Sequence, residues 1–238
     1  MPDPSAYYIS RKPRLLREFD RYVKYTRPVL IRYFGEDNVI ALIGETRREY
    51  ENLIPQLPYI GGTQPFTQFI ISTGMLLAVY WTAKGHGKAL AEIGELIYEI
   101  SRALLRAYPA FLVRFFGNMN FSKFYLSRLR KRAIASHQRE YPDGYVYDFI
   151  EGERRTFDYG VDYIECASCK FLSKQGAYEL APYLCTADIL YSEALGWGLM
   201  RTKTLAEGAE KCDFRFKKGG PTKVAVPDAM RHVIARNE

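Results

Sequence analysis

All four cysteines of the chain lie in its last third. Cys166 and Cys169 form a C-x-x-C pair at a predicted strand-to-helix junction, where the positive end of a helix lowers a thiol pKa. Cys185 precedes Asp188 by three residues, a spacing that places both on one face of a predicted helix. Cys212 begins a predicted strand. Cysteine and carboxylate side chains in one region are typical of nucleophilic, proton-transfer or metal chemistry.

Three interpretations of these thiols remain open. In the first, one thiol acts as a nucleophile or proton shuttle. In the second, the cysteines are small buried hydrophobic residues. Alternatively, several bind zinc or an iron–sulfur cluster, and the ligands are then Cys166, Cys169, Cys185 and Cys212. The second C-x-x-C pair of a common zinc site is absent from the sequence, and none of the three histidines is close to a cysteine along the chain. We expect no cofactor, with zinc or a cluster as the alternative.

The elements that must position these residues change character near residue 141. Before it, apolar residues at helical spacing predict helices over residues 11–34, 37–52, 66–83, 88–107 and 110–137. Pro28 is expected to kink or interrupt the first helix. Prolines and glycines indicate a loop over residues 53–65.

After residue 141 the pattern predicts a strand, two helices and two more strands, over residues 156–164, 167–176, 179–195, 199–205 and 211–217. The fold class is therefore α+β, with a helical N-terminal part packed against a small antiparallel sheet and two helices. We expect regions at residues 1–141 and 142–238 that together form one compact domain. The last 17 residues are weakly patterned.

Composition and charge narrow the class of protein. The 238 residues are 47% hydrophobic and 26% charged, which excludes a disordered or low-complexity chain. The 19 tyrosines and 14 phenylalanines indicate either core and rim packing or a pocket lined with hydroxyl groups. Residues 1–10 contain no basic region followed by an apolar core, so we expect no signal peptide, and the apolar run 69–82 is too short to span a bilayer. We expect a cytoplasmic protein with reduced thiols.

The charge of +7 is uneven, because residues 1–141 carry 21 Lys and Arg against 12 Asp and Glu. The most basic segment, residues 123–139, includes Arg128, Arg130, Lys131 and Arg132. Such a half could meet nucleic acid, anionic lipid or an anionic ligand, or it could simply be a set of solvated helix faces. No nucleic-acid-binding module surrounds the basic run, so nucleic acid is not an expected partner.

The order of several motifs adds a more specific indication. They are the strand leading to Cys166, Gly176 followed by Glu179-Leu180-Ala181-Pro182, Cys185-x-x-Asp188, Arg201-x-x-Thr204 with Gly208, and Cys212-Asp213-Phe214-Arg215-Phe216. Residues 157–216, which hold these motifs, resemble the L-2-amino-thiazoline-4-carboxylic acid hydrolase family. The resemblance implies a hydrolase that opens a 2-amino-thiazoline ring carrying a carboxylate, to give a carbamoylated cysteine.

That activity needs a nucleophile at the amidine-like ring carbon, a proton donor and a cation for the carboxylate. We expect Cys185 or Cys212 to attack, or Asp188 to activate water while a cysteine donates a proton. Arg201 or Arg215 would hold the carboxylate. In the last strand Cys212 points with Phe214 and Phe216, and Asp213 and Arg215 point the other way, so Cys185, Cys212 and Asp188 rank above Asp213.

The region also looks like small-ligand-binding domains of the vinyl-reductase type. The alternative function is therefore a small-ligand or metal-binding sensory module that uses the same thiols. The expected partner is a small carboxylate-bearing substrate, and a homo-oligomer remains open.

Overall fold

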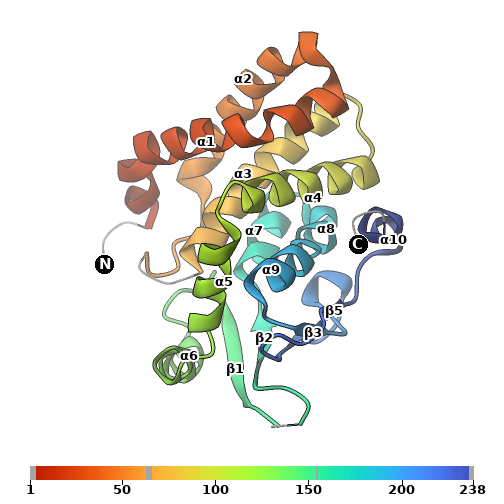
Figure 1. Ribbon diagram of the computed structural model, residues 1–238. Coiled ribbons are helices and arrows are strands. Elements are labelled where there is room, and N and C mark those ends of the chain that lie inside the picture. The colour runs from red at the N-terminus through yellow and green to blue at the C-terminus, as the bar shows by residue number, and fades with distance from the viewer. Residues whose placement is uncertain (1–3, 63–65, 154, 236–238) are drawn as a thin grey trace.

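The computed structural model describes residues 4–62, 66–153 and 155–235. Long helices occupy the N-terminal part, and a small sheet with short helices follows (Figure 1). The N-terminal helices are α1 (Pro4–Phe34), α2 (Glu36–Leu53), α3 (Thr67–Gly85), α4 (Leu90–Arg106), α5 (Ala110–Met119) and α6 (Lys123–Ser136), with a 3-10 turn η1 (Ile54–Gln56). The later helices are α7 (Ala167–Lys174), α8 (Ala181–Leu184), α9 (Ala187–Leu195) and α10 (Asp228–Ala235), with 3-10 turns η2 (Tyr178–Leu180) and η3 (Leu205–Glu207).

The sheet contains the strands β1 (Val146–Glu151), β2 (Tyr159–Glu165), β3 (Leu199–Arg201), β4 (Cys212–Phe216) and β5 (Lys223–Val224). Within the described ranges their order is β1-β2-β4-β3-β5. Every neighbouring pair is antiparallel except β3 and β5, which are parallel. The α+β class is confirmed, but the expected purely antiparallel sheet is wrong, because the chain after β4 returns alongside β3.

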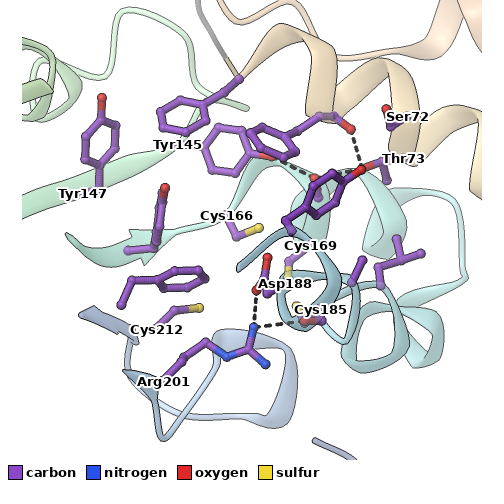
Figure 2. A pocket seen from close by; sticks show the side chains of 18 of the residues that line it. Ser72, Thr73, Tyr145, Tyr147, Cys166, Cys169, Cys185, Asp188, Arg201 and Cys212 are labelled. Atoms are coloured by element: carbon purple, nitrogen blue, oxygen red, sulfur yellow. Dashed lines mark hydrogen bonds and ion pairs between the residues drawn. The ribbon is translucent and has the colours of Figure 1, made fainter. Parts of the chain in front are cut away.

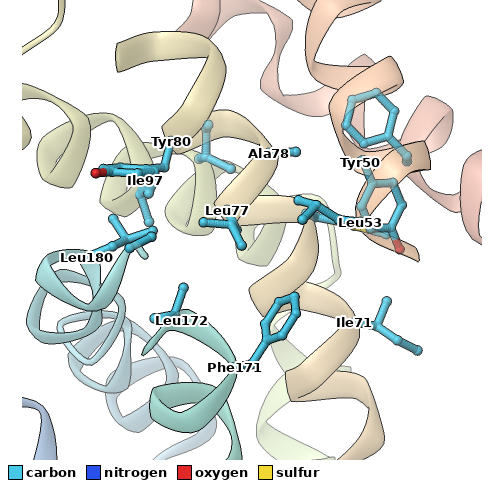
Figure 3. Close-up of a cluster of buried hydrophobic side chains, with 14 of the residues drawn as sticks. Tyr50, Leu53, Ile71, Leu77, Ala78, Tyr80, Ile97, Phe171, Leu172 and Leu180 are labelled. Atoms are coloured by element: carbon cyan, nitrogen blue, oxygen red, sulfur yellow. The ribbon is translucent and has the colours of Figure 1, made fainter. Parts of the chain in front are cut away.

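One hydrophobic cluster joins the N-terminal helices to the region that follows the sheet's second strand. Its fully buried members include Leu77 of α3, Ile97 of α4, Leu172 of α7 and Leu180 of η2 (Figure 3). Phe171 of α7 is 2% exposed in the same cluster. Burying side chains of this size stabilises the fold by about 1.5–3 kcal/mol each. Helix α7 is therefore fixed against the N-terminal helices.

The register of β2 and β4 places their large apolar residues on one face. Tyr163 pairs with Cys212, Val161 with Phe214, and Tyr159 with Phe216. Because side chains alternate between the two faces of a strand, Asp162, Asp213 and Arg215 lie on the opposite face. Tyr159, Tyr163, Phe214 and Phe216 therefore form one aromatic face of the sheet.

Several boundaries differ from those that the sequence patterns predict. The helix expected over residues 110–137 is divided into α5 and α6, because the Ser122 hydroxyl accepts the backbone N–H of Tyr125 and begins a new helix. Conversely, α1 continues through Pro28. The strand expected over residues 199–205 ends at Arg201, because the Asp213 carboxylate accepts the backbone N–H groups of Thr202 and Lys203, each at 2.9 Å.

Three elements are not predicted from the sequence. Strand β1 is missed, although it pairs with β2 along its whole length. The two residues of β5 are too few to form a pattern. Helix α10 lies in the weakly patterned C-terminus, where Met230 and Val233 are buried. Each of these elements is defined by its partner in space rather than by its own sequence.

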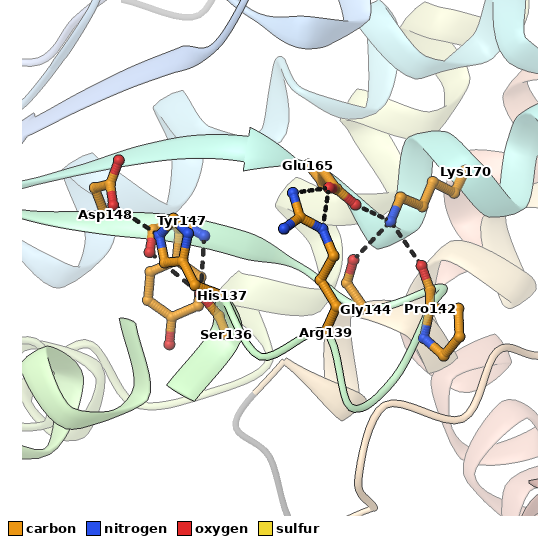
Figure 4. A network of polar contacts seen from close by, with 9 residues as sticks. All are labelled: Ser136, His137, Arg139, Pro142, Gly144, Tyr147, Asp148, Glu165 and Lys170. Carbon is orange, nitrogen blue, oxygen red and sulfur yellow. Dashed lines mark hydrogen bonds and ion pairs between the residues drawn. The ribbon is translucent and has the colours of Figure 1, made fainter. Parts of the chain in front are cut away.

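A polar network fixes the segment between α6 and β1 (Figure 4). Lys170 of α7 donates to the carbonyl oxygens of Pro142, at 2.8 Å, and Gly144, at 3.3 Å, and pairs with Glu165. Arg139 binds the same carboxylate with distances of 2.8 and 3.0 Å. The segment therefore reaches β1 while it is held against the start of α7.

Replacing Leu77 by Ala tests whether this shared core holds the two regions together. Leu77 is fully buried at the junction of α3 with α7, so we expect a loss of about 2–5 kcal/mol in the free energy of unfolding. Urea denaturation followed by circular dichroism measures it. The matched control Ile40→Ala, at a residue 73% exposed on α2, should change stability by less than about 0.5 kcal/mol. Equal effects would contradict the assignment.

Candidate active site

A cavity of about 420 Å³ lies between the aromatic face of the sheet and the surrounding helices. All four cysteines line it, although they come from the end of β2, from α7, from the segment between α8 and α9, and from β4. Figure 2 shows the four sulfur atoms around the same space. The aromatic wall includes six tyrosines, Tyr125, Tyr145, Tyr147, Tyr159, Tyr163 and Tyr191. The abundance of tyrosine in the sequence thus serves partly to line a pocket.

Cys166 has the environment of a thiolate. It directly follows β2 and is the N-cap residue of α7, where backbone N–H groups point outward from the helix. Hydrogen bonding with the Cys169 thiol lowers the pKa of Cys166, although burial acts in the opposite direction. The C-x-x-C spacing creates this pairing, because it returns the second thiol to the first turn of the helix.

The other three thiols are held in the protonated form. The hydrogen bond to Cys166 and then burial raise the pKa of Cys169. Burial raises the pKa of Cys185, and it raises that of Cys212 to about 11. The Cys212 sulfur accepts the backbone N–H of Leu205 at 3.2 Å, which opposes that shift. The cavity therefore combines one thiol whose pKa is lowered with three thiols whose pKa values are raised.

A row of hydroxyl groups runs beside Cys166. The Tyr145 hydroxyl lies 2.8 Å from that of Ser168, which lies 3.0 Å from that of Thr73, and Thr73 donates to the Phe69 carbonyl at 2.8 Å. Burial raises the pKa of Tyr145 well above its ordinary value, and the nearby Cys166 raises it further. Tyr145 is therefore a neutral phenol, and a neutral phenol can donate a proton or a hydrogen bond to a bound molecule.

Asp188 and Arg201 form an ion pair at the opposite wall. Arg201 is 2% exposed, pairs with Asp188, and donates to the carbonyl oxygens of Cys185, at 3.1 Å, and Ala225, at 2.9 Å. Burial raises the pKa of Asp188 although Arg201 lowers it. Two buried donors in this wall, Arg201 Nε and Trp197 Nε1, have no hydrogen-bond partner within the described residues.

One contact of Arg201 lies where a predicted helix is divided. Residues 179–195 were expected to form one helix, but the chain is divided into η2, α8 and α9. Cys185 lies at the break, where the Thr186 hydroxyl donates to the Tyr183 carbonyl at 2.6 Å and Arg201 takes the Cys185 carbonyl. Cys185 and Asp188 therefore lie on either side of the boundary between α8 and α9, and both face the same cavity.

The structure separates the predicted site residues into two groups. Cys185, Cys212, Asp188 and Arg201 line the cavity, together with Cys166 and Cys169. Arg215 does not line it, and instead its guanidinium lies 2.7 Å from Asp162 on the other face of the sheet. Asp213 is on that face as well, bound to the backbone after β3. Neither of them faces the space that the cysteines share.

Two further cavity residues escaped the analysis of the sequence. Arg132, a half-buried residue of α6, lines the cavity and has no carboxylate partner in the described part of the chain. Arg132 lies in a run of basic residues that the sequence does not distinguish from one another. Leu129 and Ala133, the buried residues of α6, are the only signal that this side of the helix faces the cavity. Tyr145 had no signal of its own. The thiolate character of Cys166 was indicated by its place at the strand-to-helix junction.

The metal interpretation finds no support. A metal site needs several His, Cys, Asp or Glu side chains close together. Within the described ranges, no group of three or more such side chains could hold a metal ion. The four thiols border one cavity. In the same ranges, no helix has the length and apolar character needed to cross a bilayer.

The pKa directions predict an order of alkylation. Because the pKa of Cys166 is lowered, its thiolate persists as the pH falls, whereas Cys185 and Cys212 become thiolates only at high pH. Brief iodoacetamide treatment of the folded protein from pH 6 to 10, with peptide mass spectrometry, should modify Cys166 at the lowest pH. Cys169→Ala should move that midpoint upward, because alanine has no group that can donate a hydrogen bond to the Cys166 sulfur. Modification of Cys185 or Cys212 before Cys166 would contradict this account.

The sequence that forms this cavity matches a known protein family. A family model described as L-2-amino-thiazoline-4-carboxylic acid hydrolase matches residues 68–216, from α3 to the end of β4. No curated protein and no solved structure matches the chain. The matched residues include all four cysteines and most of the cavity wall, so the family features and the cavity coincide. The chain belongs to the L-2-amino-thiazoline-4-carboxylic acid hydrolase family.

Proposed function

We propose that this protein hydrolyses a cyclic amidine of the 2-amino-thiazoline-4-carboxylate type, with Cys166 as the nucleophile. The observation that carries the proposal is the Cys166 thiol, whose pKa is lowered inside a cavity of about 420 Å³ while the pKa values of the neighbouring Cys169 and Tyr145 are raised. The family supports the same class of reaction. The earlier candidates Cys185 and Cys212 are less suited to attack, since burial keeps their thiols protonated.

The reaction proceeds in two balanced steps. The Cys166 sulfur forms a bond to the ring carbon C2, the C2–N double-bond electrons move to nitrogen, and that nitrogen takes a proton. A nitrogen lone pair then re-forms the C2–N double bond as the C2–S ring bond breaks, and the ring sulfur takes a proton and leaves as a thiol. An isothiourea remains on Cys166. Water adds to the same carbon, Cys166 leaves as the thiolate, and the product is the N-carbamoyl amino acid.

Neighbouring groups have suitable protonation states for these transfers. Tyr145 and Cys169 are both protonated and lie beside Cys166, so either can supply the first proton. Asp188 faces the cavity from the other wall, and burial raises its pKa, which makes its carboxylate a stronger base for the attacking water. Arg201 holds Asp188 in place through the ion pair, and so acts as a positioning residue.

The substrate carboxylate requires a cation that is not already neutralised. Arg201 is paired with Asp188, and its side chain is only 1% exposed, so the role of carboxylate ligand would require it to leave that pair. Arg132 lines the cavity and has no described carboxylate partner. We therefore assign the attraction of the carboxylate to Arg132.

The first test compares serine substitutions at three cysteines. Cys166→Ser should lower turnover of the thiazoline about a thousandfold or more, because it removes the nucleophile. Cys185→Ser and Cys212→Ser are the matched controls and should retain turnover within about tenfold. Rapid acid quench of the wild-type protein should show an adduct on Cys166 that adds the full mass of the substrate, since ring opening releases no fragment. Retained turnover in Cys166→Ser would rule out the mechanism.

The second test separates binding from chemistry. Arg132→Met should raise KM about tenfold or more, and kcat should stay within a few-fold, because the guanidinium attracts the carboxylate but does not touch the reacting carbon. Arg128→Met, an exposed change on the same helix, provides the control and should leave both constants unchanged. A fall in kcat without a change in KM would contradict the role given to Arg132.

A further inference from the structure

The most exposed apolar surface of the molecule lies on α5 and α6. Of the thirteen large hydrophobic residues that are exposed in the described part of the chain, eight fall between residues 108 and 134. They are Tyr108, Phe111, Leu112, Phe115, Phe116, Met119, Phe124 and Ile134. Phe111 is 72% exposed and Phe124 is 70% exposed. Clusters of this kind on a monomer mark an interaction site more often than isolated exposed residues do.

The packing of α5 explains why its phenylalanines face outward. Gly117 is buried, and a Cβ atom there would lie 1.9 Å from the Leu195 carbonyl oxygen, so α5 approaches the end of α9 with its glycine side. Phe111, Phe115 and Phe116 occupy the remaining surface of the helix, and the last two rings are 5.8 Å apart. The close contact at Gly117 fixes the apolar face in the solvent direction.

The same segment is strongly cationic. Between Glu99 and Glu140 the sequence contains nine Lys and Arg and no Asp or Glu. Arg130 is paired with Glu151. Lys123, Arg128 and Lys131 are exposed, and in the described ranges no carboxylate pairs with them. Arg128 lies 4.9 Å from the ring centre of Phe124, so a cationic and an aromatic group meet on the exposed side of α6.

We propose that α5 and α6 form a docking surface for an anionic lipid bilayer. Phenylalanine, leucine and methionine side chains would enter the boundary between headgroups and acyl chains, and the Lys and Arg side chains would bind the lipid phosphates. A second copy of the chain fits less well, because a two-fold interface would set uncompensated cations against each other. Nucleic acid would satisfy the cations but offers little to Leu112, Met119 and Ile134.

The docking surface is connected to the cavity through α6. Tyr125, Leu129 and Arg132 line the cavity from the inner side of this helix, whereas Phe124, Arg128 and Lys131 are exposed on its outer side. Binding to a bilayer would therefore bring one cavity wall to the lipid surface. This inference rests on the exposed surface alone and does not depend on the proposed hydrolase activity.

Sedimentation of the full chain with lipid vesicles tests the proposal. Vesicles of 30% phosphatidylglycerol in phosphatidylcholine should bind the protein, whereas pure phosphatidylcholine vesicles should bind it about tenfold more weakly, and 0.5 M NaCl should reduce the binding. Phe115→Ser with Phe116→Ser should weaken binding about tenfold or more, and so should Arg128→Glu with Lys131→Glu.

Matched controls change the same chemistry elsewhere on the surface. Tyr25→Ser with Ile40→Ser removes two exposed apolar residues, and Arg17→Glu with Lys24→Glu reverses two exposed charges on α1, so both should bind as the wild type does. Circular dichroism confirms that each variant is folded. Equal binding by the patch and control variants, binding to DNA but not to vesicles, or a dimer that Phe115→Ser with Phe116→Ser dissociates would each overturn the proposal.

Discussion

Helix α7 joins the sheet to the N-terminal helices, and the site depends on this connection. Phe171 and Leu172 are buried among residues of α3 and α4. The cap residue of the same helix, Cys166, directly follows β2. The position of the thiol is thus set by a hydrophobic core on one side and by strand pairing on the other. Both are extended, cooperative interactions, so the orientation of Cys166 is more rigid than that of a residue on a free loop.

The electrostatics of the cavity follow from that geometry. A buried thiol ordinarily has a raised pKa, as Cys185 and Cys212 show. Cys166 differs because the first turn of α7 supplies the Cys169 thiol as a hydrogen-bond donor. The C-x-x-C pair therefore separates the pKa values of its two members, one downward and one upward. Two groups with opposed protonation states side by side are a common basis for acid–base and nucleophilic chemistry.

The Asp188–Arg201 pair has a different physical character. Burying both charges costs solvation free energy, which the pair and the carbonyl contacts of Arg201 offset. Arg201 binds the Cys185 carbonyl between the end of α8 and the start of α9, and it also pairs with Asp188 in the first turn of α9. The same arginine therefore contacts both the boundary between the two helices and the Asp188 carboxylate. The buried pair thus has its charges neutralised, whereas α5 and α6 have exposed apolar residues and, in the described part of the chain, cations such as Arg128 and Lys131 without a carboxylate partner.

The sequence by itself determined the α+β class, most helices of the N-terminal part and the family, because apolar spacing and ordered motifs are local signals. The alternation in the last strand also separated Cys212, Phe214 and Phe216 from Asp213 and Arg215, since the side-chain period of a strand is fixed by its backbone. Only the tertiary structure decided that four distant cysteines share one cavity and that Arg132 and Tyr145 join them. It also decided where β1, β5 and the break before α9 occur. Those features depend on residues outside the local segment, such as β2 for β1 and Arg201 for Cys185. A local sequence pattern does not identify such partners.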